Sequence, residues 1–226
     1  MKARQQTSFL FDLDGTLIDS VYDHVLAWHD ALQEEGIDIS IWRVHRKIGM
    51  SGGLFTKALA RETGHELGDE QVARLRALHA KHYNSRSMKT RPLPGARELL
   101  KYLTGNKIPW AIATSGRMVT AGPVLEILGV DPAKQVVITR DQVRYAKPDP
   151  DLFLAAAEKL GVEIDTACVV GDAIWDMLAA RRARALGIGL LSGGYGVEEL
   201  ERAGAYRVYD DPADLLAHID EVGGRR

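Results

Sequence analysis

The length and composition of the chain already exclude several classes of protein. Its 226 residues, 46% hydrophobic and 27% charged, allow one large globular domain or a core with a smaller companion. A net charge of −2 gives no reason to expect nucleic acid or an anionic membrane surface as a partner, and no stretch approaches the length of a membrane span. With one cysteine and a polar start unlike a signal peptide, we expect a cytoplasmic protein.

Two acidic residues follow the first predicted strand. The short apolar run at 9–11 suits a strand buried on both faces, and it leads directly to Asp12 and Asp14, with Gly15 and Thr16 after them. Open α/β sheets bind ligands at the carboxyl ends of their strands. Two acids this close repel each other unless a cation or a shared proton intervenes. For the Asp-Gly pair alone, the alternative is an ordinary turn.

Residues 20–91 predict helices and no convincing strand. Apolar side chains from Val21 to Leu32 recur at helical spacing, and Gly36 is a stop signal. The glycine-rich stretch 49–53 predicts a flexible joint between two shorter helices. Three further helical patterns lie at 41–48, 54–59 and 72–82.

Beyond a proline-containing boundary at 91–95, strands and helices alternate along the chain. This alternation predicts a parallel sheet with helices between its strands. The expected strands lie at 109–114, 135–138, 167–170, 186–191 and 206–208, and the expected helices are centred near Leu125, Ala156, Ala180, Leu200 and Leu215.

The first strand must join this same sheet, because a lone strand is not stable. We therefore expect an α/β protein with a Rossmann-like parallel-sheet core, formed by residues 1–19 and 92–226. Residues 20–91 are then an insertion, and both of its linkers leave from near Asp12. A helical cap, or lid, over the active site is the natural interpretation of this insertion.

A turn with hydroxyl groups follows the second predicted strand. Thr114 ends that strand, and Ser115 and Gly116 come next, before a helix that begins near Arg117. The free N–H groups and the dipole of a helix start favour a phosphate, and Ser115 is placed to cap this helix. Taken alone, the turn is more often a plain helix cap than a phosphate site.

A lysine and two further acids complete the set of polar residues near strand ends. Lys147 precedes a proline turn, and Asp172 follows the apolar strand at 167–170, with Asp176 four residues later. An isolated Lys-Pro is usually a surface turn, and the dipole favours an acid such as Asp176 in the first turn of a helix. Taken one at a time, these residues therefore have plain explanations.

The sequence from Asp12 to Thr16 resembles the first motif of the haloacid dehalogenase superfamily, whose members mostly hydrolyse phosphate esters through an aspartyl-phosphate. Thr114, Lys147 and Asp172 match the three later motifs in order. The helical insertion matches the C1-type cap of one large branch in kind, and the chain resembles phosphoglycolate phosphatases and β-phosphoglucomutases. The resemblance covers nearly the whole chain.

The resemblance implies a role for each of these residues. Asp12 is the nucleophile, Asp14 the general acid and base, and Lys147 the cation that holds the phosphoryl oxygens. Asp12, Asp172 and a backbone carbonyl at Asp14 bind Mg²⁺, and Asp176 acts behind them or through water. Phosphate contacts are expected from Thr114, Gly15, Thr16, Ser115 and Gly116.

We therefore expect a Mg²⁺-dependent phosphatase acting on a small phosphate monoester, either phosphoglycolate-like or a sugar phosphate. One alternative is a phosphomutase with the same core. A mutase of the β-phosphoglucomutase type carries an arginine just after a Gly-x-Ser joint in its cap, whereas here Gly52 and Gly53 follow Ser51. A second alternative, a non-catalytic binding or regulatory protein, is disfavoured by the intact motif set. The oligomeric state is not readable from the sequence.

Several other residues have plainer interpretations. Cys168 is expected to be an inert core residue, and His24, which aligns with a cap-hinge histidine of β-phosphoglucomutase-like members, is a weak candidate. The basic run at 43–47 fits a solvated helix face better than a substrate contact. Trp28, Trp42 and Trp110 are expected to be packed.

Overall fold

The computed structural model describes residues 7–64, 66–87 and 89–224. Residues 1–6 and 225–226 of the expected core, and residues 65 and 88 of the expected cap, lie outside the described part of the chain.

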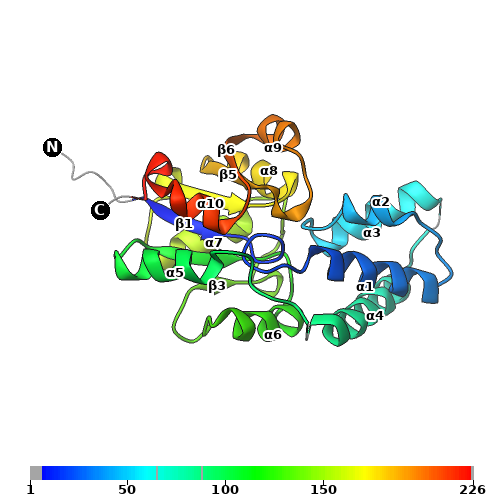
Figure 1. Ribbon diagram of the computed structural model, residues 1–226. Helices are drawn as coiled ribbons and strands as arrows, with labels where there is room; N and C mark the ends of the chain where they lie inside the picture. The colour runs from blue at the N-terminus through cyan, green and yellow to red at the C-terminus, as the bar shows by residue number, and fades with distance from the viewer. Residues whose placement is uncertain (1–6, 65, 88, 225–226) are drawn as a thin grey trace.

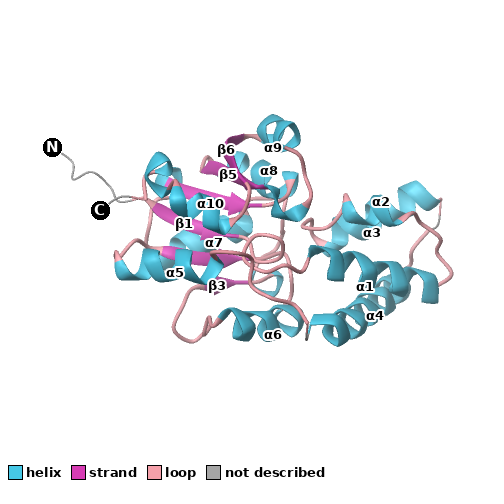
Figure 2. Cartoon of the chain, viewed as in Figure 1, coloured by secondary structure: helices cyan, strands magenta, loops and turns pink. Residues whose placement is uncertain are grey.

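Six parallel strands form one sheet, in the order β3-β2-β1-β4-β5-β6 (Figures 1 and 2). The central strand β1 pairs with β2 on one side and β4 on the other, with Leu10 opposite Ala111 and Val169. All five predicted later strands are present, so the prediction of an α/β parallel sheet is confirmed. The strands are β1 (Ser8–Phe11), β2 (Trp110–Ala113), β3 (Val137–Ile138), β4 (Ala167–Gly171), β5 (Leu186–Leu190) and β6 (Ala205–Tyr209).

Helices cover both faces of the sheet. Side chains alternate along each strand, so each strand contributes apolar residues to both faces. Phe9 and Phe11 of β1 lie in one cluster with apolar residues of helices α5, α6 and α10. Leu10, between them, lies in a second cluster with residues of α7 and α8. These helices are α5 (Ala96–Gly105), α6 (Met118–Leu128), α7 (Asp151–Leu160), α8 (Ile174–Ala183), α9 (Val197–Ala203) and α10 (Pro212–Ala217).

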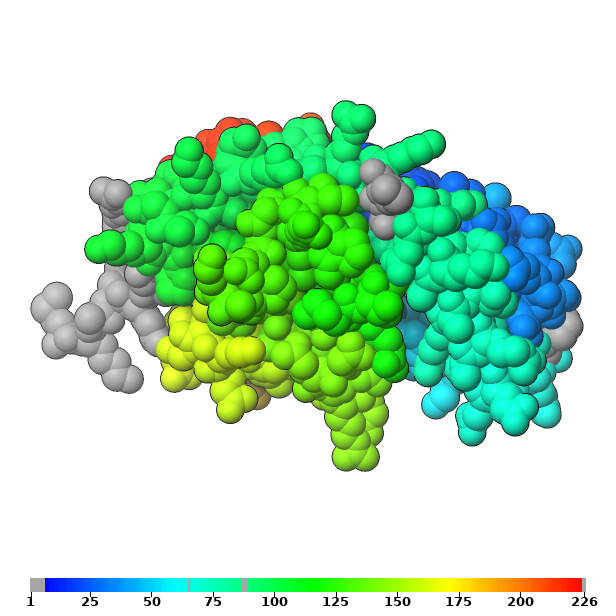
Figure 3. All heavy atoms as spheres, turned by 90° about the horizontal axis from the view of Figure 1, so that it is seen from below, coloured from blue at the N-terminus to red at the C-terminus, as the bar shows by residue number. Residues whose placement is uncertain are grey.

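Four more helices pack together beyond the carboxyl ends of the strands (Figures 1 and 2). They are α1 (Val21–Glu34), α2 (Ile41–His45), α3 (Gly52–Thr63) and α4 (Asp69–Ser87). Val25, Leu59 and Leu75 are fully buried in their shared core. This group is the predicted helical cap, and we use that name for it, although its limits at residues 20 and 91 stay a prediction. Seen from below, α4 (teal) lies against α6 (green) (Figure 3).

Two expectations for the cap were wrong. Helix α3 already begins at Gly52, so Gly52 and Gly53 belong to its first turn, where the hydroxyl of Ser51 accepts a hydrogen bond from the N–H of Leu54 at 3.3 Å. Trp42, in the first turn of the short helix α2, is 62% exposed rather than packed, and Val44 is the buried residue of that helix. The guanidinium of Arg43 lies over its ring, 4.7 Å from the centroid.

Two further expectations concern the lone cysteine and membrane-spanning helices. Cys168 is buried in β4, as expected, and burial raises the pKa of its thiol to about 12. Among the residues that the structure describes, no helix combines the length and apolar character needed to cross a membrane.

Candidate active site

Three strand ends bring the predicted catalytic residues together. Asp12 follows β1, Thr114 follows β2 and Asp172 follows β4. Since β1 lies between β2 and β4 and all three run in parallel, these residues gather at one edge of the sheet. Asp12 is held there by its N–H, which donates to the carbonyl of Val170 at 2.9 Å.

The turn after β1 is shaped by a glycine. Gly15 has φ +79, and a Cβ at that position would lie 2.5 Å from Oδ2 of Asp172. Only glycine therefore suits both the backbone conformation and the close approach of Asp172. The next residue, Thr16, is fully buried, and its hydroxyl donates to Oδ1 of Asp172 at 2.9 Å. The turn thus fixes the position of Asp172.

Lys147 lies beneath the strand ends as the buried counter-charge of the acids. Its ammonium forms ion pairs with Asp12 and with Asp176, the latter at 2.8 Å. Asp176 lies in the first turn of α8, where its carboxylate also accepts a hydrogen bond from the N–H of Ala173 at 3.1 Å. Burial lowers the pKa of Lys147, but the charges of Asp12 and Asp176 outweigh it, so the pKa is raised and the lysine stays protonated.

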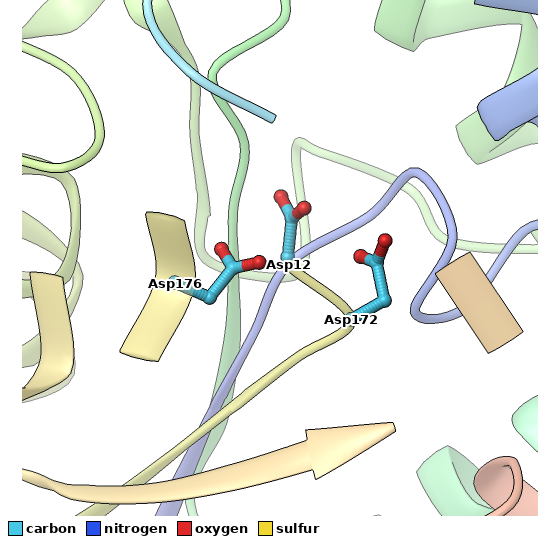
Figure 4. Close-up of side chains that lie close together, drawn as sticks. All are labelled: Asp12, Asp172 and Asp176. Atoms are coloured by element: carbon cyan, nitrogen blue, oxygen red, sulfur yellow. The ribbon is translucent and has the colours of Figure 1, made fainter. Parts of the chain in front are cut away.

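Asp12, Asp172 and Asp176 form a buried cluster in which one carboxylate oxygen from each residue lies within 4.8 Å of the others (Figure 4). Burial raises the pKa of Asp12, Lys147 lowers it, and Asp176 and Asp14 raise it again, to about 7. Burial and the charges of Asp176 and Asp12 raise the pKa of Asp172 well above its usual range. One lysine does not neutralise three acids, so a divalent cation fits this oxygen-rich site.

Asp14 has a different environment, although it is only two residues from Asp12. Its Oδ1 accepts a hydrogen bond from the hydroxyl of Ser20 at 2.6 Å and lies 3.1 Å from Nε2 of His24. The hydroxyl of Tyr83 also donates to it, at 3.4 Å. Burial raises the pKa of Asp14, but the charge and hydrogen bonds of His24 and Ser20 outweigh it, so the pKa is lowered. His24, a weak candidate in the sequence, is thus a direct partner of Asp14.

The cap closes a cavity of about 210 Å³ over this edge of the sheet. Its cap side carries stacked rings: Trp28 packs on Phe55 and on His79, with ring centroids 4.2 Å apart in both pairs. Nε2 of His79 lies 3.0 Å from Nδ1 of His24, which connects this wall to Asp14. The sequence contained no sign of His79, because it lies in an ordinary amphipathic helical pattern.

The predicted site residues divide into two layers. Asp12, Asp14, Thr114, Ser115 and Gly116 line the cavity itself. The remaining predicted residues contact this first group or one another behind the cavity wall. They are Gly15, Thr16, Lys147, Asp172 and Asp176.

Ser115 does not cap α6, contrary to expectation. The N-cap residue is Arg117, and the N–H of Met118 is bound instead by Oδ2 of Asp141 at 3.0 Å. The hydroxyl of Ser115 has no hydrogen-bond partner among the described residues. It lines the cavity, where a phosphate oxygen would satisfy it.

The basic run of the cap is not a solvated helix face, which corrects the sequence interpretation. Lys47 is buried and its ammonium lies 2.8 Å from Glu62, while it also lines the cavity. Arg46 pairs with Glu199 of α9, and Nε2 of His45 lies 2.8 Å from the carbonyl oxygen of Gly193. These side chains therefore connect the cap internally and to the core.

Comparisons with known proteins agree with this geometry. The family model of haloacid dehalogenase-like hydrolases matches residues 7–184. Hexitol phosphatase A of Escherichia coli (strain K12) is 34% identical over 167 residues, which cover 73% of this chain and 74% of that protein. A phosphoglycolate phosphatase of Agrobacterium fabrum is 32% identical over 188 residues, covering 81% and 80% of the two chains.

Solved structures show the same fold. The crystal structure of a hydrolase from Pseudomonas syringae superposes with a TM-score of 0.95 at 59% identity, covering 96% of this chain and all of that one. A β-phosphoglucomutase from Clostridium difficile gives a TM-score of 0.82 at 24% identity, with 96% and 97% of the chains covered. At that identity the second likeness concerns the fold alone.

Proposed function

Because this chain belongs to the haloacid dehalogenase-like hydrolases and is a phosphoric monoester hydrolase, we propose that it is Mg²⁺-dependent and works through an aspartyl-phosphate at Asp12. Its substrate is a small phosphorylated metabolite, and its compartment is the cytoplasm. The observation that carries the proposal is the position of Asp12, at the floor of the cavity, in an ion pair with Lys147 and within a cluster of acids.

In the first step, a carboxylate oxygen of Asp12 attacks the phosphorus atom, and the bond from phosphorus to the ester oxygen breaks. The leaving alkoxide takes a proton from Asp14, which lines the same cavity. Water then attacks the phosphoryl group, Asp14 accepts its proton, and inorganic phosphate leaves as Asp12 is regenerated. Asp14 thus acts first as an acid and then as a base.

The remaining residues hold the phosphoryl group and offset its charge. Lys147 supplies a buried positive charge beside Asp12, and the hydroxyls of Thr114 and Ser115 face the transferred oxygens from the neighbouring strand end. Asp12 and Asp172, with the Asp14 carbonyl, would bind Mg²⁺, and Asp176 would support them. When bound, this ion offsets the negative charge of phosphate and acids.

The nucleophile is tested by the substitution Asp12→Asn. The amide is nearly isosteric but is a poor nucleophile, so we expect phosphate release to fall by about 10³-fold or more while the circular dichroism spectrum is retained. The measurement is phosphate release from a panel of monoesters with Mg²⁺ and with EDTA. We expect activity with Mg²⁺ and none with EDTA.

Asp149→Asn is the matched control for this experiment. Asp149 lies two residues from Lys147, but its half-exposed carboxylate pairs with Arg182 at 3.3 Å. We expect near wild-type turnover from this variant. An Asp12→Asn enzyme that keeps a tenth of the activity, or full turnover in EDTA with no trace metal present, contradicts the mechanism.

A further inference from the structure

Three arginines from separate elements line the same cavity as Asp12. Arg76 comes from α4 of the cap, Arg117 precedes α6, and Arg140 begins the short 3₁₀ helix η1 (Arg140–Gln142). The last two meet at the turn after β2, because the N–H of Arg140 donates to the carbonyl of Gly116 at 2.9 Å. In Figure 3, the bright green residues of α6 meet the teal residues of α4.

The positive charges of these arginines are only partly matched. Arg117 pairs with Asp141 at 3.0 Å. Arg140 donates to backbone carbonyls of Val143 and Arg144, at 2.6 and 3.1 Å, and pairs with no carboxylate among the described residues. Arg76 has neither a hydrogen bond nor an ion pair in the described part of the chain. Of the three guanidinium groups, only that of Arg117 is paired with a carboxylate in the described part of the chain.

Burial and charge both act on Arg76. Its pKa is lowered, first by burial and then by the charges of Arg117 and Arg140, so the three groups are close enough to repel one another. Nε of Arg76 also lies near the start of α3, 3.7 Å from where a Cβ on Gly52 would be. An arginine half-withdrawn from water without a partner costs free energy, and a bound anion would offset this cost.

We propose that the substrate carries a second anionic group, a carboxylate or a second phosphate, on the end remote from the reacting phosphate, and that Arg76 binds it with Arg117 and Arg140. This inference rests on the proposed phosphatase function and narrows its substrate class. The guanidinium fork matches both kinds of anion in a bidentate manner. A polyol phosphate has only hydroxyl groups at its remote end, and these would leave the charges of the arginines unmatched.

Lys47, the other cap cation at the cavity, is a useful contrast. Its ammonium lies 2.8 Å from Glu62 and donates to the carbonyl of Arg43 at 3.0 Å. Its charge is therefore already matched within the cap, and we assign the second anion to the arginines instead. Because its ammonium is already paired, Lys47 does not offer a free amine to a ligand in the cavity.

The test compares substrates that differ only in the remote group. One pair is 2-phosphoglycolate and ethyl phosphate, and the other is fructose 1,6-bisphosphate and fructose 6-phosphate. For the wild-type enzyme we expect kcat/KM to favour the acidic member of at least one pair about tenfold or more, as a charge-assisted hydrogen bond allows. The pair with the larger ratio identifies the anion as carboxylate or phosphate. Ratios near one in both pairs overturn the inference.

Arg76→Gln tests the assigned residue. It should reduce the ratio of kcat/KM between the substrate with the remote anion and its partner without it, roughly 10- to 100-fold. Arg76→Lys should restore part of this ratio, because the charge returns without the bidentate fork. The control is Arg74→Gln on the same helix, since Arg74 is exposed and pairs with Glu35 at 3.0 Å. A loss that is equal for both members of a pair would show a structural role and refute the assignment.

Binding separates this inference from the proposed chemistry. Calorimetric titration of the Asp12→Asn variant with 2-phosphoglycolate, fructose 1,6-bisphosphate and the two partner compounds that lack the remote anion, in Mg²⁺, requires no turnover. If no monoester is hydrolysed by the wild-type protein, the phosphatase proposal fails. Tighter binding of an acidic member, lost with Arg76→Gln, still supports the anion site, and equal binding of all four compounds overturns it.

Discussion

At the scale of single residues, the two acids after β1 show how environment decides chemistry. Asp12 lies among other acids, and its pKa is raised to about 7, mainly by burial. Asp14 is partly buried, and its pKa is lowered because His24 and Ser20 face its carboxylate. The same residue type thus has opposite shifts two positions apart. A cation bound beside Asp12 would favour the ionised nucleophile that the proposed mechanism needs, whereas Asp14 must take up a proton before it can act as the acid.

Asp172→Asn should stabilise the metal-free protein and remove its response to Mg²⁺. The pKa of Asp172 is raised in the folded state, so at pH 8 its ionised form costs stability that the uncharged amide avoids. We expect a gain of about 1 kcal/mol or more in EDTA, which raises Tm by roughly 2–4 °C per kcal/mol. Differential scanning calorimetry with EDTA and with Mg²⁺ measures both effects.

Asp19→Asn is the control for this prediction, since Asp19 is an exposed acid that follows the same turn. It should leave both the metal-free Tm and the Mg²⁺ response close to wild type. A lower Tm for Asp172→Asn in EDTA would contradict charge repulsion at Asp172. A full Mg²⁺ response in that variant would contradict its role as a metal ligand.

At the scale of elements, the end of α2 connects the cap to the core loop that follows β5. The guanidinium of Arg46 pairs with Glu199 and lies over the ring of Tyr195, 4.1 Å from its centroid. The hydroxyl of Tyr195 donates to the carbonyl of Arg46 at 3.1 Å. Nε2 of His45 adds its contact with Gly193 at 2.8 Å. These contacts hold the cap in the closed position that forms the cavity.

Glu199→Gln should loosen this connection without unfolding either part. Both charged side chains are about a third or more exposed, so solvent screens the pair, and a loss of up to about 1 kcal/mol is expected. KM should then rise roughly two- to fivefold, and amides at 41–48 should exchange hydrogen faster. Steady-state kinetics and hydrogen-exchange mass spectrometry provide these values.

Glu198→Gln, one position earlier in α9, is the matched control. Among the described residues, Glu198 pairs only within its own helix, with Arg202 at 3.1 Å, and both side chains are 81% exposed. Equal exchange rates at 41–48 in the two variants would contradict a role for Glu199 in holding the cap.

At the scale of the whole molecule, the core and the cap together decide between hydrolysis and phosphoryl exchange. The sequence argument against a mutase was the absence of a cation after Ser51. Residues 52 and 53 are indeed glycines, but Arg76 brings a guanidinium beside Gly52 from another helix. The presence or absence of a cap cation near Ser51 therefore no longer distinguishes a phosphatase from a mutase. Relatives at 34% and 32% identity are phosphatases, whereas the mutase likeness, at 24%, concerns the fold alone.

We expect the enzyme to release phosphate from simple monoesters and not to interconvert glucose 1-phosphate and glucose 6-phosphate, in either anomeric form. A mutase must exclude water while the phosphoryl group returns to a second hydroxyl. Phosphorus NMR of each sugar phosphate, incubated with enzyme and Mg²⁺, follows both outcomes in one spectrum. Rapid interconversion with negligible phosphate release would replace the phosphatase proposal and leave the assignments at Asp12 and Lys147 standing.

The sequence by itself determined the sheet, the helical cap and the residues at the strand ends. Apolar runs and helical spacing are local patterns, and parallel strands place their carboxyl ends together whatever the details of packing. That is why Asp12, Thr114 and Asp172 were found from the sequence and lie side by side in the structure.

Only the tertiary structure decided which cap residues face the site. The contact between His24 and His79 joins residues 55 positions apart, and Arg76 lines the same cavity as Arg140, although the two elements share no sequence pattern. Such meetings depend on the rotation of each helix about its axis and on how closely the cap sits on the core. Helical periodicity identifies the buried face of α4, but not which of its partly exposed side chains will turn toward the cavity.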